Sequence, residues 1–168
     1  MADPLRAVET PLSPAEWRAA MGCFPSGVTI VTSWRGETPV GATASSFCSV
    51  SLEPPLLLVC LDLANSVLGP IESGGLFGIN ILGAAHRELA LLFGRKPETG
   101  RFASAPFRAH PRGAPQLAAA SVFVDCALER VHEAGDHKIV VGRGVRIDHA
   151  SPATPLLYHK GAFPGFEP

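Results

Sequence analysis

The sequence predicts a mainly β protein, an antiparallel barrel with a few helices at its periphery. Runs of β-branched and apolar residues follow one another along the chain, with only short helical patterns between them. A parallel α/β sheet would need a helix between almost every pair of strands, and that alternation is missing. No G-x-G-x-x-G segment follows a strand either, so any nucleotide cofactor would be bound without a Rossmann domain.

The first elements are a capped helix and a β-hairpin. The segment Ser13-Pro14-Ala15-Glu16 has the pattern of a capping box and predicts a helix that ends near Gly22. A β-branched run then predicts a strand over residues 28–34. Turn residues follow it, and we expect the chain to return as a single strand over residues 40–47.

The middle of the chain contains an uninterrupted apolar run. Pro54 and Pro55 cannot donate to a β-ladder, so they separate this run from the preceding strand. The run, Leu56 to Leu61, is typical of a strand buried on both faces. After it, Asn65 or Ser66 is expected to cap a short helix that extends through Ile71.

The rest of the chain is predicted to add strands, one clear helix and a long loop. The helix is 86–93, with Gly94 as the residue that ends it. Residues 95–115 are polar and rich in Gly and Pro, and loops of this length are uncommon unless they are functional. The expected strands are 76–82, a hairpin of 121–131 and 138–148, and a short strand at 156–159.

Composition excludes several classes of protein. The chain has 168 residues and a formal charge of -1, which suits one domain and gives no basic surplus for nucleic acid. No apolar run approaches the length of a membrane span, and no signal peptide is visible, so we expect a cytoplasmic location. We expect a flexible arm over residues 1–12 and a single domain over residues 13–168. The four cysteines have no C-x-x-C spacing, so no metal site is predicted.

The segment Gly41–Pro55 is the first candidate for a ligand site. It combines small residues, which allow a flat ligand to approach the main chain, with a row of serine and threonine hydroxyls. A hydroxyl-rich strand on the wet face of a sheet is the alternative. Nucleophilic catalysis is not indicated, because no G-x-S-x-G elbow precedes a helix.

Three other features are candidates for binding. Asn65 and Ser66 stand at a predicted helix start, where side chains and free N–H groups can hold a phosphate, although a simple cap is the more common role. His137 lies in a turn at the start of a strand. Arg101, beside Phe102 in the long loop, can supply a cation for a phosphate.

Taken together, six motifs in order resemble the short-chain flavin reductase family, the reductase components of two-component flavin-dependent monooxygenases. The resemblance extends from about Phe24 to Tyr158. The motifs are F-P-S-G-V-T-I-V-T (24–32), G-A-T-A-S-S-F-C-S-V-S-L-E-P-P-L (41–56), N-S (65–66), F-x-I-N-I-L (77–82), G-D-H (135–137) and P-L-L-Y-H (155–159).

The resemblance implies a split β-barrel that forms a homodimer, with FMN or FAD near the subunit interface. It implies reduction of the flavin by NADH or NADPH, and passage of the reduced flavin to a separate monooxygenase. His137 would lie beside the flavin ring and the nicotinamide and is the one catalytic candidate. The cofactor-binding residues that the resemblance implies are Thr43, Ala44, Ser45, Ser46, Cys60, Leu61, Asp62, Asn65, Ser66, Arg101, Phe102, His137 and Tyr158.

One departure from the family pattern concerns the phosphate. Many members have a basic or hydroxyl residue after the Asn-Ser pair, whereas this chain has Val67-Leu68-Gly69. Arg101 would then be more important for neutralising the phosphate. Two other functions stay open: a split-barrel flavoenzyme that retains its flavin and acts on its own substrate, and a non-catalytic barrel that binds flavin or haem.

Overall fold

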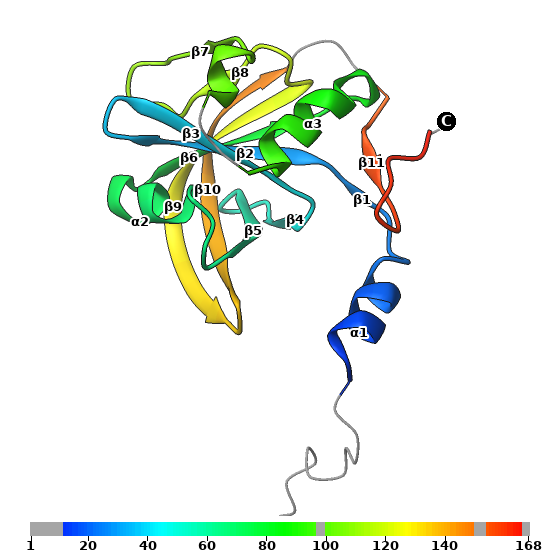
Figure 1. The fold of residues 1–168 in the computed structure, drawn as a ribbon. Coiled ribbons are helices and arrows are strands. Elements are labelled where there is room, and N and C mark those ends of the chain that lie inside the picture. Colours follow the sequence, from blue (N-terminus) through cyan, green and yellow to red (C-terminus); the bar gives the residue numbers. More distant parts are fainter. Residues whose placement is uncertain (1–11, 97–99, 150–153, 166–168) are drawn as a thin grey trace, which may run out of the picture.

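The computed structural model describes residues 12–96, 100–149 and 154–165. The expected flexible arm lies, apart from Leu12, outside these residues. The fold is a curved antiparallel sheet with helices at its periphery, so the predicted class is confirmed (Figure 1). Seven strands form the sheet in the order β3-β2-β6-β9-β10-β5-β4. Their bounds are β2 Thr29–Arg35, β3 Thr38–Ala44, β4 Phe47–Ser51, β5 Leu56–Asp62, β6 Leu76–Ile81, β9 Val122–Ala134 and β10 His137–His149.

Two short strand pairs and three α-helices complete the described structure. The capping box at Ser13 is present, and the helix that it begins stands away from the barrel (Figure 1). The helices are α1 Pro14–Met21, α2 Leu68–Gly74 and α3 Arg87–Gly94, with short 3-10 turns at Ala84–His86 and Arg101–Ala103. The strand pairs are β1 Ser26–Gly27 with β11 Leu157–Tyr158, and β7 Phe107–Arg108 with β8 Gln116–Leu117.

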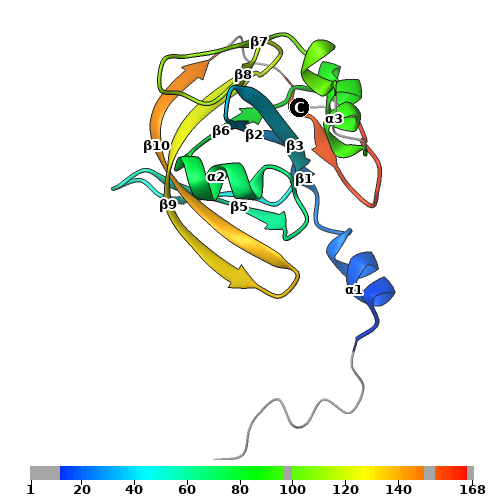
Figure 2. The ribbon, with the colours of Figure 1, turned by 60° about the vertical axis from the view of Figure 1, so that its left-hand side comes forward.

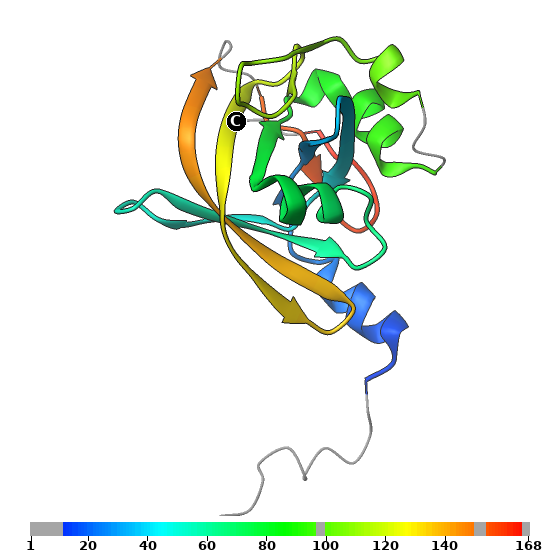
Figure 3. The same ribbon diagram turned by 90° about the vertical axis from the view of Figure 1, so that its left-hand side faces the viewer.

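The long β9–β10 hairpin closes the barrel by pairing with different strands along its two halves. Residues 122–127 of β9 pair with β6, whereas residues 137–143 of β10 pair with β5. Register shifts between β9 and β10, at Val141/Gly142 and Gly144/Arg146, bend the hairpin between these halves. Figure 3 shows the result, with the tip of the β9–β10 hairpin and the β4–β5 hairpin both extending from the body of the sheet.

The predicted single strand over residues 40–47 is wrong, because the chain forms two strands there. β3 ends at Ala44, and β4 begins at Phe47. β3 pairs with β2 and β4 pairs with β5, so the two strands lie at opposite ends of the sheet order. The Ser45–Ser46 junction therefore joins the two edges of the sheet, and the chain breaks there because each strand follows a different partner.

Two apolar clusters lie on opposite faces of β2. Val31 faces the barrel interior, where it packs with Val59, Phe77 and the α2 residue Ile71. Figure 2 shows α2 inside the curve of the sheet. Ile30, next in the chain, faces outward into a second cluster formed with α3 residues. Since residues 29–33 are all buried, β2 is covered on both faces, as is β6 over residues 77–80.

Burial on both faces was predicted for the strand Leu56–Leu61, and this prediction is wrong for the single chain. In β5, Leu57, Val59 and Leu61 are buried, but Leu56, Leu58 and Cys60 are only partly buried. β5 lies next to the edge strand β4, and within the described residues its outer face is left partly open.

The ends of α2 and α3 also differ from prediction. α2 begins at Leu68, later than expected, and Asn65 does not cap it; the Asn65 Oδ1 atom instead accepts from the Val67 N–H at 3.1 Å. Gly94 is the last residue of α3 and not a left-handed residue after it, because the chain enters an extended conformation at Arg95.

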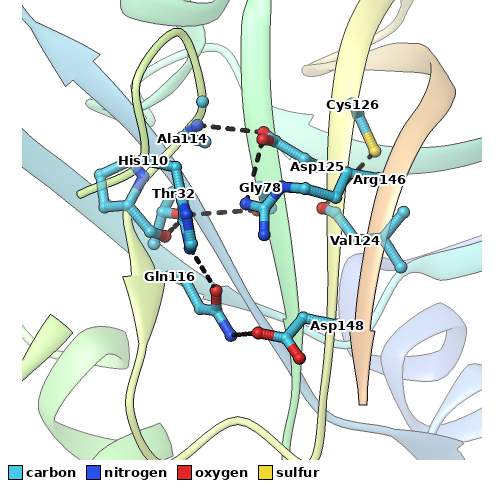
Figure 4. A network of polar contacts seen from close by, with 12 residues as sticks. Thr32, Gly78, His110, Ala114, Gln116, Val124, Asp125, Cys126, Arg146 and Asp148 are labelled. Carbon is cyan, nitrogen blue, oxygen red and sulfur yellow. Dashed lines mark hydrogen bonds and ion pairs between the residues drawn. The ribbon is translucent and has the colours of Figure 1, made fainter. Parts of the chain in front are cut away.

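Residues 95–115 were predicted to be a polar surface loop, but in the described part of it Arg101, Ala105 and residues 113–115 are buried. Residues 113–117 are buried, and a polar network holds them to β9 and β10 (Figure 4). Asp125 accepts from the Ala114 N–H at 3.0 Å and pairs with Arg146 at 3.2 Å. Gln116 donates to Asp148 at 2.8 Å. The network covers the outward face of the β9–β10 hairpin.

Within the described ranges, no helix is long and apolar enough to cross a membrane. The same residues contain no group of three or more His, Cys, Asp or Glu side chains that could hold a metal ion.

Candidate active site

Two clefts adjoin at the segment Ala42–Phe47. The first, the narrow cleft, has a volume of about 240 Å³ and lies between β3, the end of β5 and the end of α3. The second, the broad cleft, has a volume of about 1150 Å³ and lies between α1, the Ser45–Ser46 junction and β11. The narrow cleft is lined by Ala42, Thr43, Asp62, Ala64, Asn65, Phe93, Gly94, Lys96 and Arg101. The broad cleft includes Trp17, Arg18, Phe24, Ser45, Phe47, Asp136, Tyr158 and Lys160 in its lining.

The four predicted residues of the segment Thr43–Ser46 have different surroundings. Thr43 lines the narrow cleft, and its hydroxyl donates to the Ala90 carbonyl oxygen of α3 at 2.6 Å. Ala44 packs into the interior cluster, and its carbonyl oxygen accepts from the Thr29 hydroxyl at 2.9 Å. Ser45 is exposed and lines the broad cleft. Alternation along an extended chain thus divides the segment between core and cleft.

Ser46 connects the junction to β5. Its hydroxyl donates to the Cys60 carbonyl oxygen at 2.7 Å and accepts from the Cys60 N–H at 3.2 Å. The main-chain N–H and carbonyl groups of Cys60, a residue expected to bind the cofactor, are therefore both bonded to Ser46. Burial raises the pKa of the Cys60 thiol above its ordinary value.

At the end of β5 only one of the predicted residues lines a cleft. Leu61 is 2% exposed and belongs to the interior cluster. Asp62 lines the narrow cleft, and its Oδ1 atom accepts from the Ala64 N–H at 2.7 Å. This bond shapes the turn that brings Asn65 to the same cleft.

Asn65 and Ser66, the predicted phosphate-binding pair, lie in the turn between β5 and α2. Asn65 lines the narrow cleft. Ser66 is fixed through its carbonyl oxygen, which accepts from Arg35 Nη2 at 2.9 Å. Its hydroxyl oxygen is buried and has no hydrogen-bond partner within the described part of the chain. A buried hydroxyl without a partner is costly, which favours a ligand that accepts from it.

Arg101 lines the narrow cleft but also holds the β3 edge in place. It is 5% exposed; its Nη1 donates to the Gly41 carbonyl oxygen at 2.7 Å, and its Nη2 donates to the Arg95 carbonyl oxygen. Phe102 packs edge-to-face against Phe93 and Phe107. Arg101 therefore contributes to the lining of the narrow cleft, whereas Phe102 belongs to an aromatic cluster with Phe93 and Phe107.

His137 and Tyr158 lie at the broad cleft or beside it. His137 is the register partner of Asp62, and its Nδ1 atom lies 2.7 Å from Oδ1 of Asp136, a residue of the broad cleft. Tyr158 lines that cleft, and its ring lies 5.4 Å from the ring of Phe163. The strand order therefore collects side chains from β3, β5, β10 and β11, which are distant in sequence.

Several residues of the clefts were not predicted from the sequence. Lys96 is the most important, because it adds a flexible cation to the narrow cleft. Its position depends on where α3 ends relative to β3, and no local motif indicates that. The same holds for Trp17 and Phe24 of the broad cleft, which were expected only as parts of a helix and a turn.

Known proteins resemble this chain over most of its length. The family model described as flavin reductase like domain matches residues 21–167. The flavin-dependent monooxygenase reductase subunit HsaB of Rhodococcus jostii is 34% identical over 157 residues, which cover 94% of this chain and 80% of that protein. FMN reductase (NADH) RutF of Methylorubrum extorquens is 37% identical over 149 residues, which cover 88% of this chain and 73% of that protein.

A solved structure has the same fold over almost the whole chain. The NADH:FAD oxidoreductase SgcE6 of Streptomyces globisporus C-1027 superposes with a TM-score of 0.86 at 32% identity, covering 95% of this chain and 98% of that one. The match of the family model over most of the chain, the identities and the shared fold lead to one conclusion: the chain belongs to the flavin reductase like domain family.

Proposed function

We propose that the protein is an NAD(P)H-dependent flavin reductase, which reduces FMN or FAD and supplies the reduced flavin to a separate monooxygenase. The observation that carries the proposal is the pair of clefts that adjoin at Ala42–Phe47, one with a cation and polar groups and one with aromatic walls. The names of relatives support it, since they include a monooxygenase reductase subunit and an FMN reductase (NADH).

The narrow cleft fits the phosphate end of a flavin nucleotide. Lys96 and Asn65 line it, and the buried Ser66 hydroxyl next to Asn65 has no hydrogen-bond partner among the described residues. Together they offer a positive charge and donors to phosphate oxygens, as a small anion requires. Lys96 takes the place of the basic residue that Val67-Leu68-Gly69 lacks, while Arg101 supports the cleft wall.

The broad cleft fits flat ring systems. Trp17, Phe24, Phe47 and Tyr158 line it, and Ser45 brings a hydroxyl to the same wall. Hydride transfer is the chemistry that a nicotinamide and a flavin supply when both are bound. The protein has to hold the two rings in contact and keep water out, so the site needs flat walls and few acids or bases.

His137 is proposed to position the nicotinamide and to contribute little to proton transfer. In a His137→Ala variant we expect the KM for the nicotinamide substrate to rise about 10-fold, as the loss of one hydrogen bond allows. The kcat is expected to stay within about 2-fold, a change below 0.5 kcal/mol. Steady-state kinetics measure both constants. An unchanged KM with a pH-dependent collapse of kcat would instead identify His137 as an acid or base.

Supply of reduced flavin to another enzyme requires a site that releases it. Open clefts are consistent with micromolar binding, about 8 kcal/mol. Gel filtration of the flavin-loaded protein measures this directly, because a weakly bound flavin separates from the protein. Retention of the flavin, together with no turnover of free flavin, would favour the enzyme that keeps its cofactor.

The deciding experiment follows NADH and NADPH oxidation by the purified protein with added FMN, FAD or riboflavin. We expect turnover that depends on the free flavin and saturates with it. Oxidation no faster than the background without protein would contradict the proposal and favour a non-catalytic binding barrel. The same data give the preference between FMN and FAD and between NADH and NADPH.

We also propose that the working form is a homodimer. α1 has no buried residue, and Trp17, Met21 and Phe24 are 56%, 51% and 79% exposed. The outer face of β5 is only partly covered as well. Large apolar side chains gathered on one side of a monomer favour burial against another molecule. A second copy placed there would complete the open side of the broad cleft.

A further inference from the structure

The turn between β9 and β10 holds a carboxylate against the predicted catalytic histidine. Oδ1 of Asp136 lies 2.7 Å from Nδ1 of His137. The turn itself is fixed, because the Leu63 N–H donates to the Asp136 carbonyl oxygen at 3.1 Å and Gly135 adopts a φ of +65°. The contact is thus part of a turn that is anchored to the end of β5.

The negative charge on Asp136 determines which ring nitrogen of His137 carries the proton. The hydrogen bond with His137, and then the charge of that ring, lower the pKa of Asp136 below its ordinary value. Asp136 is therefore ionised at neutral pH, and a carboxylate can only accept hydrogen bonds. Nδ1 of His137 must then be the donor, so in the neutral ring the lone pair is on Nε2.

We propose that Asp136 is a positioning residue that fixes the tautomer of His137, so that Nε2 accepts a hydrogen bond from the carboxamide N–H of the nicotinamide. The inference rests on the proposed function. Asp136 lines the broad cleft and Asp62, the register partner of His137, lines the narrow cleft. His137 therefore lies beside both clefts, where a ring bound in the broad cleft would approach a ligand bound in the narrow cleft.

A purely structural role explains the contact less well. The side chains of His137 and Asp136 are 43% and 91% exposed, and exposed ion pairs add little to stability. Asp136→Asn (D136N) should therefore fold normally. An asparagine amide can donate to Nδ1, which allows the other tautomer with a proton on Nε2, and that tautomer cannot accept from a carboxamide.

The test compares D136N with Glu133→Gln (E133Q). Glu133 is an exposed residue of β9 near the same turn, so E133Q removes the same charge without touching His137. Long-range proton–nitrogen NMR spectra, with the His137 signals identified from a His137→Gln variant, report the tautomer without any ligand. We expect a proton on Nδ1 in the wild type and E133Q, and a shift toward Nε2 in D136N.

Kinetics supply the second measurement. We expect D136N to raise the KM for the nicotinamide substrate about 3- to 10-fold, the loss of one neutral hydrogen bond, with kcat within about 2-fold of wild type. An unchanged tautomer in D136N overturns the positioning role, and an unchanged KM overturns its link to the nicotinamide. A wild type that oxidises neither NADH nor NADPH would refute the proposed function separately, and a tautomer shift in D136N would then still support the positioning role.

Discussion

Ser45 and Ser46 are neighbours with the same side chain and different tasks. Ser45 is exposed at the wall of the broad cleft, while the Ser46 hydroxyl makes two hydrogen bonds to the main chain of Cys60. At the Ser45–Ser46 junction the first hydroxyl is thus available to a ligand and the second secures the connection between the sheet edges.

The two serines should respond differently to substitution. Ser45→Leu is expected to block flavin binding without changing the free energy of unfolding, because a bulky side chain fills the cleft wall. Ser46→Ala should lower the free energy of unfolding by about 1 kcal/mol while flavin still binds. Flavin fluorescence titration and urea unfolding measure the two effects. Normal flavin affinity in Ser45→Leu would mean that this segment is only a structural connection.

Lys96 provides a test of the phosphate assignment. Lys96→Gln should weaken FMN binding about 10-fold, because one charge-assisted hydrogen bond is lost at a solvent-accessible site. Riboflavin lacks the phosphate, so its affinity should not change. The neighbouring Arg95→Gln is the matched control, since it removes the same charge from a residue that does not line the narrow cleft. Equal losses of affinity for FMN and riboflavin in Lys96→Gln would exclude a contact between Lys96 and the phosphate.

Among the elements, residues 113–117 are held to the β9–β10 hairpin by polar contacts of Asp125 and Asp148. The hydrogen bond from Gln116, followed by the charges of Arg108, Arg146 and His110, lowers the pKa of Asp148 below its ordinary 3.8. A carboxylate whose pKa is lower in the folded state stabilises the fold above its unfolded pKa, and this contribution is lost as the pH falls through the folded value.

This linkage predicts a pH-dependent difference between the wild type and Asp148→Asn. The wild type should be the more stable protein at pH 7, and the difference should shrink as the pH falls below about 4 and disappear once Asp148 is protonated. Urea unfolding at a series of pH values measures it. A difference that does not vary with pH would show that the charge of Asp148 does not hold this segment.

The elements that the sequence predicted well are those that local patterns specify. The capping box at Ser13 and the β-branched run of β2 determine their own conformations, so both were found in place. The break at Ser45–Ser46 could not be predicted, because it is imposed by β2 on one side and β5 on the other. The register shifts between β9 and β10 lie at Gly142 and Gly144, and a glycine inside a strand is a local signal for such an irregularity.

The residues of the two clefts divide in the same way, into those whose place follows from local patterns and those whose place depends on packing. Asp62 and Tyr158 stand at the ends of β5 and β11, Asn65 follows β5 after a short turn, and all three line the clefts. Ala44 and Leu61 belong to the core instead, since alternation along a strand sends every second side chain inward. Lys96 was missed because its place depends on the packing of α3 against β3.

For the whole molecule, the exposed apolar side of α1 gives the clearest prediction. The wild type should elute with twice the 17.6 kDa mass of the chain in gel filtration with light scattering. Replacing both Trp17 and Met21 by Ser should shift it toward the monomer and weaken flavin binding, because the broad cleft loses one wall. The same change at Val145 and Ile147, exposed residues of β10 outside both clefts, should have no effect.

The pairing of the β9–β10 hairpin has a consequence for how the chain folds. In the described sheet, β5 and β4 are joined to the other strands through β10 alone, and β10 ends at His149. During synthesis, β5 therefore cannot pair with β10 until most of the chain has left the ribosome. Contacts between residues so distant in sequence slow folding, and rates in the millisecond-to-second range are typical of such topologies. Until then the Leu56–Leu61 run is unpaired along its β10 side, and an unpaired apolar strand edge is prone to aggregation.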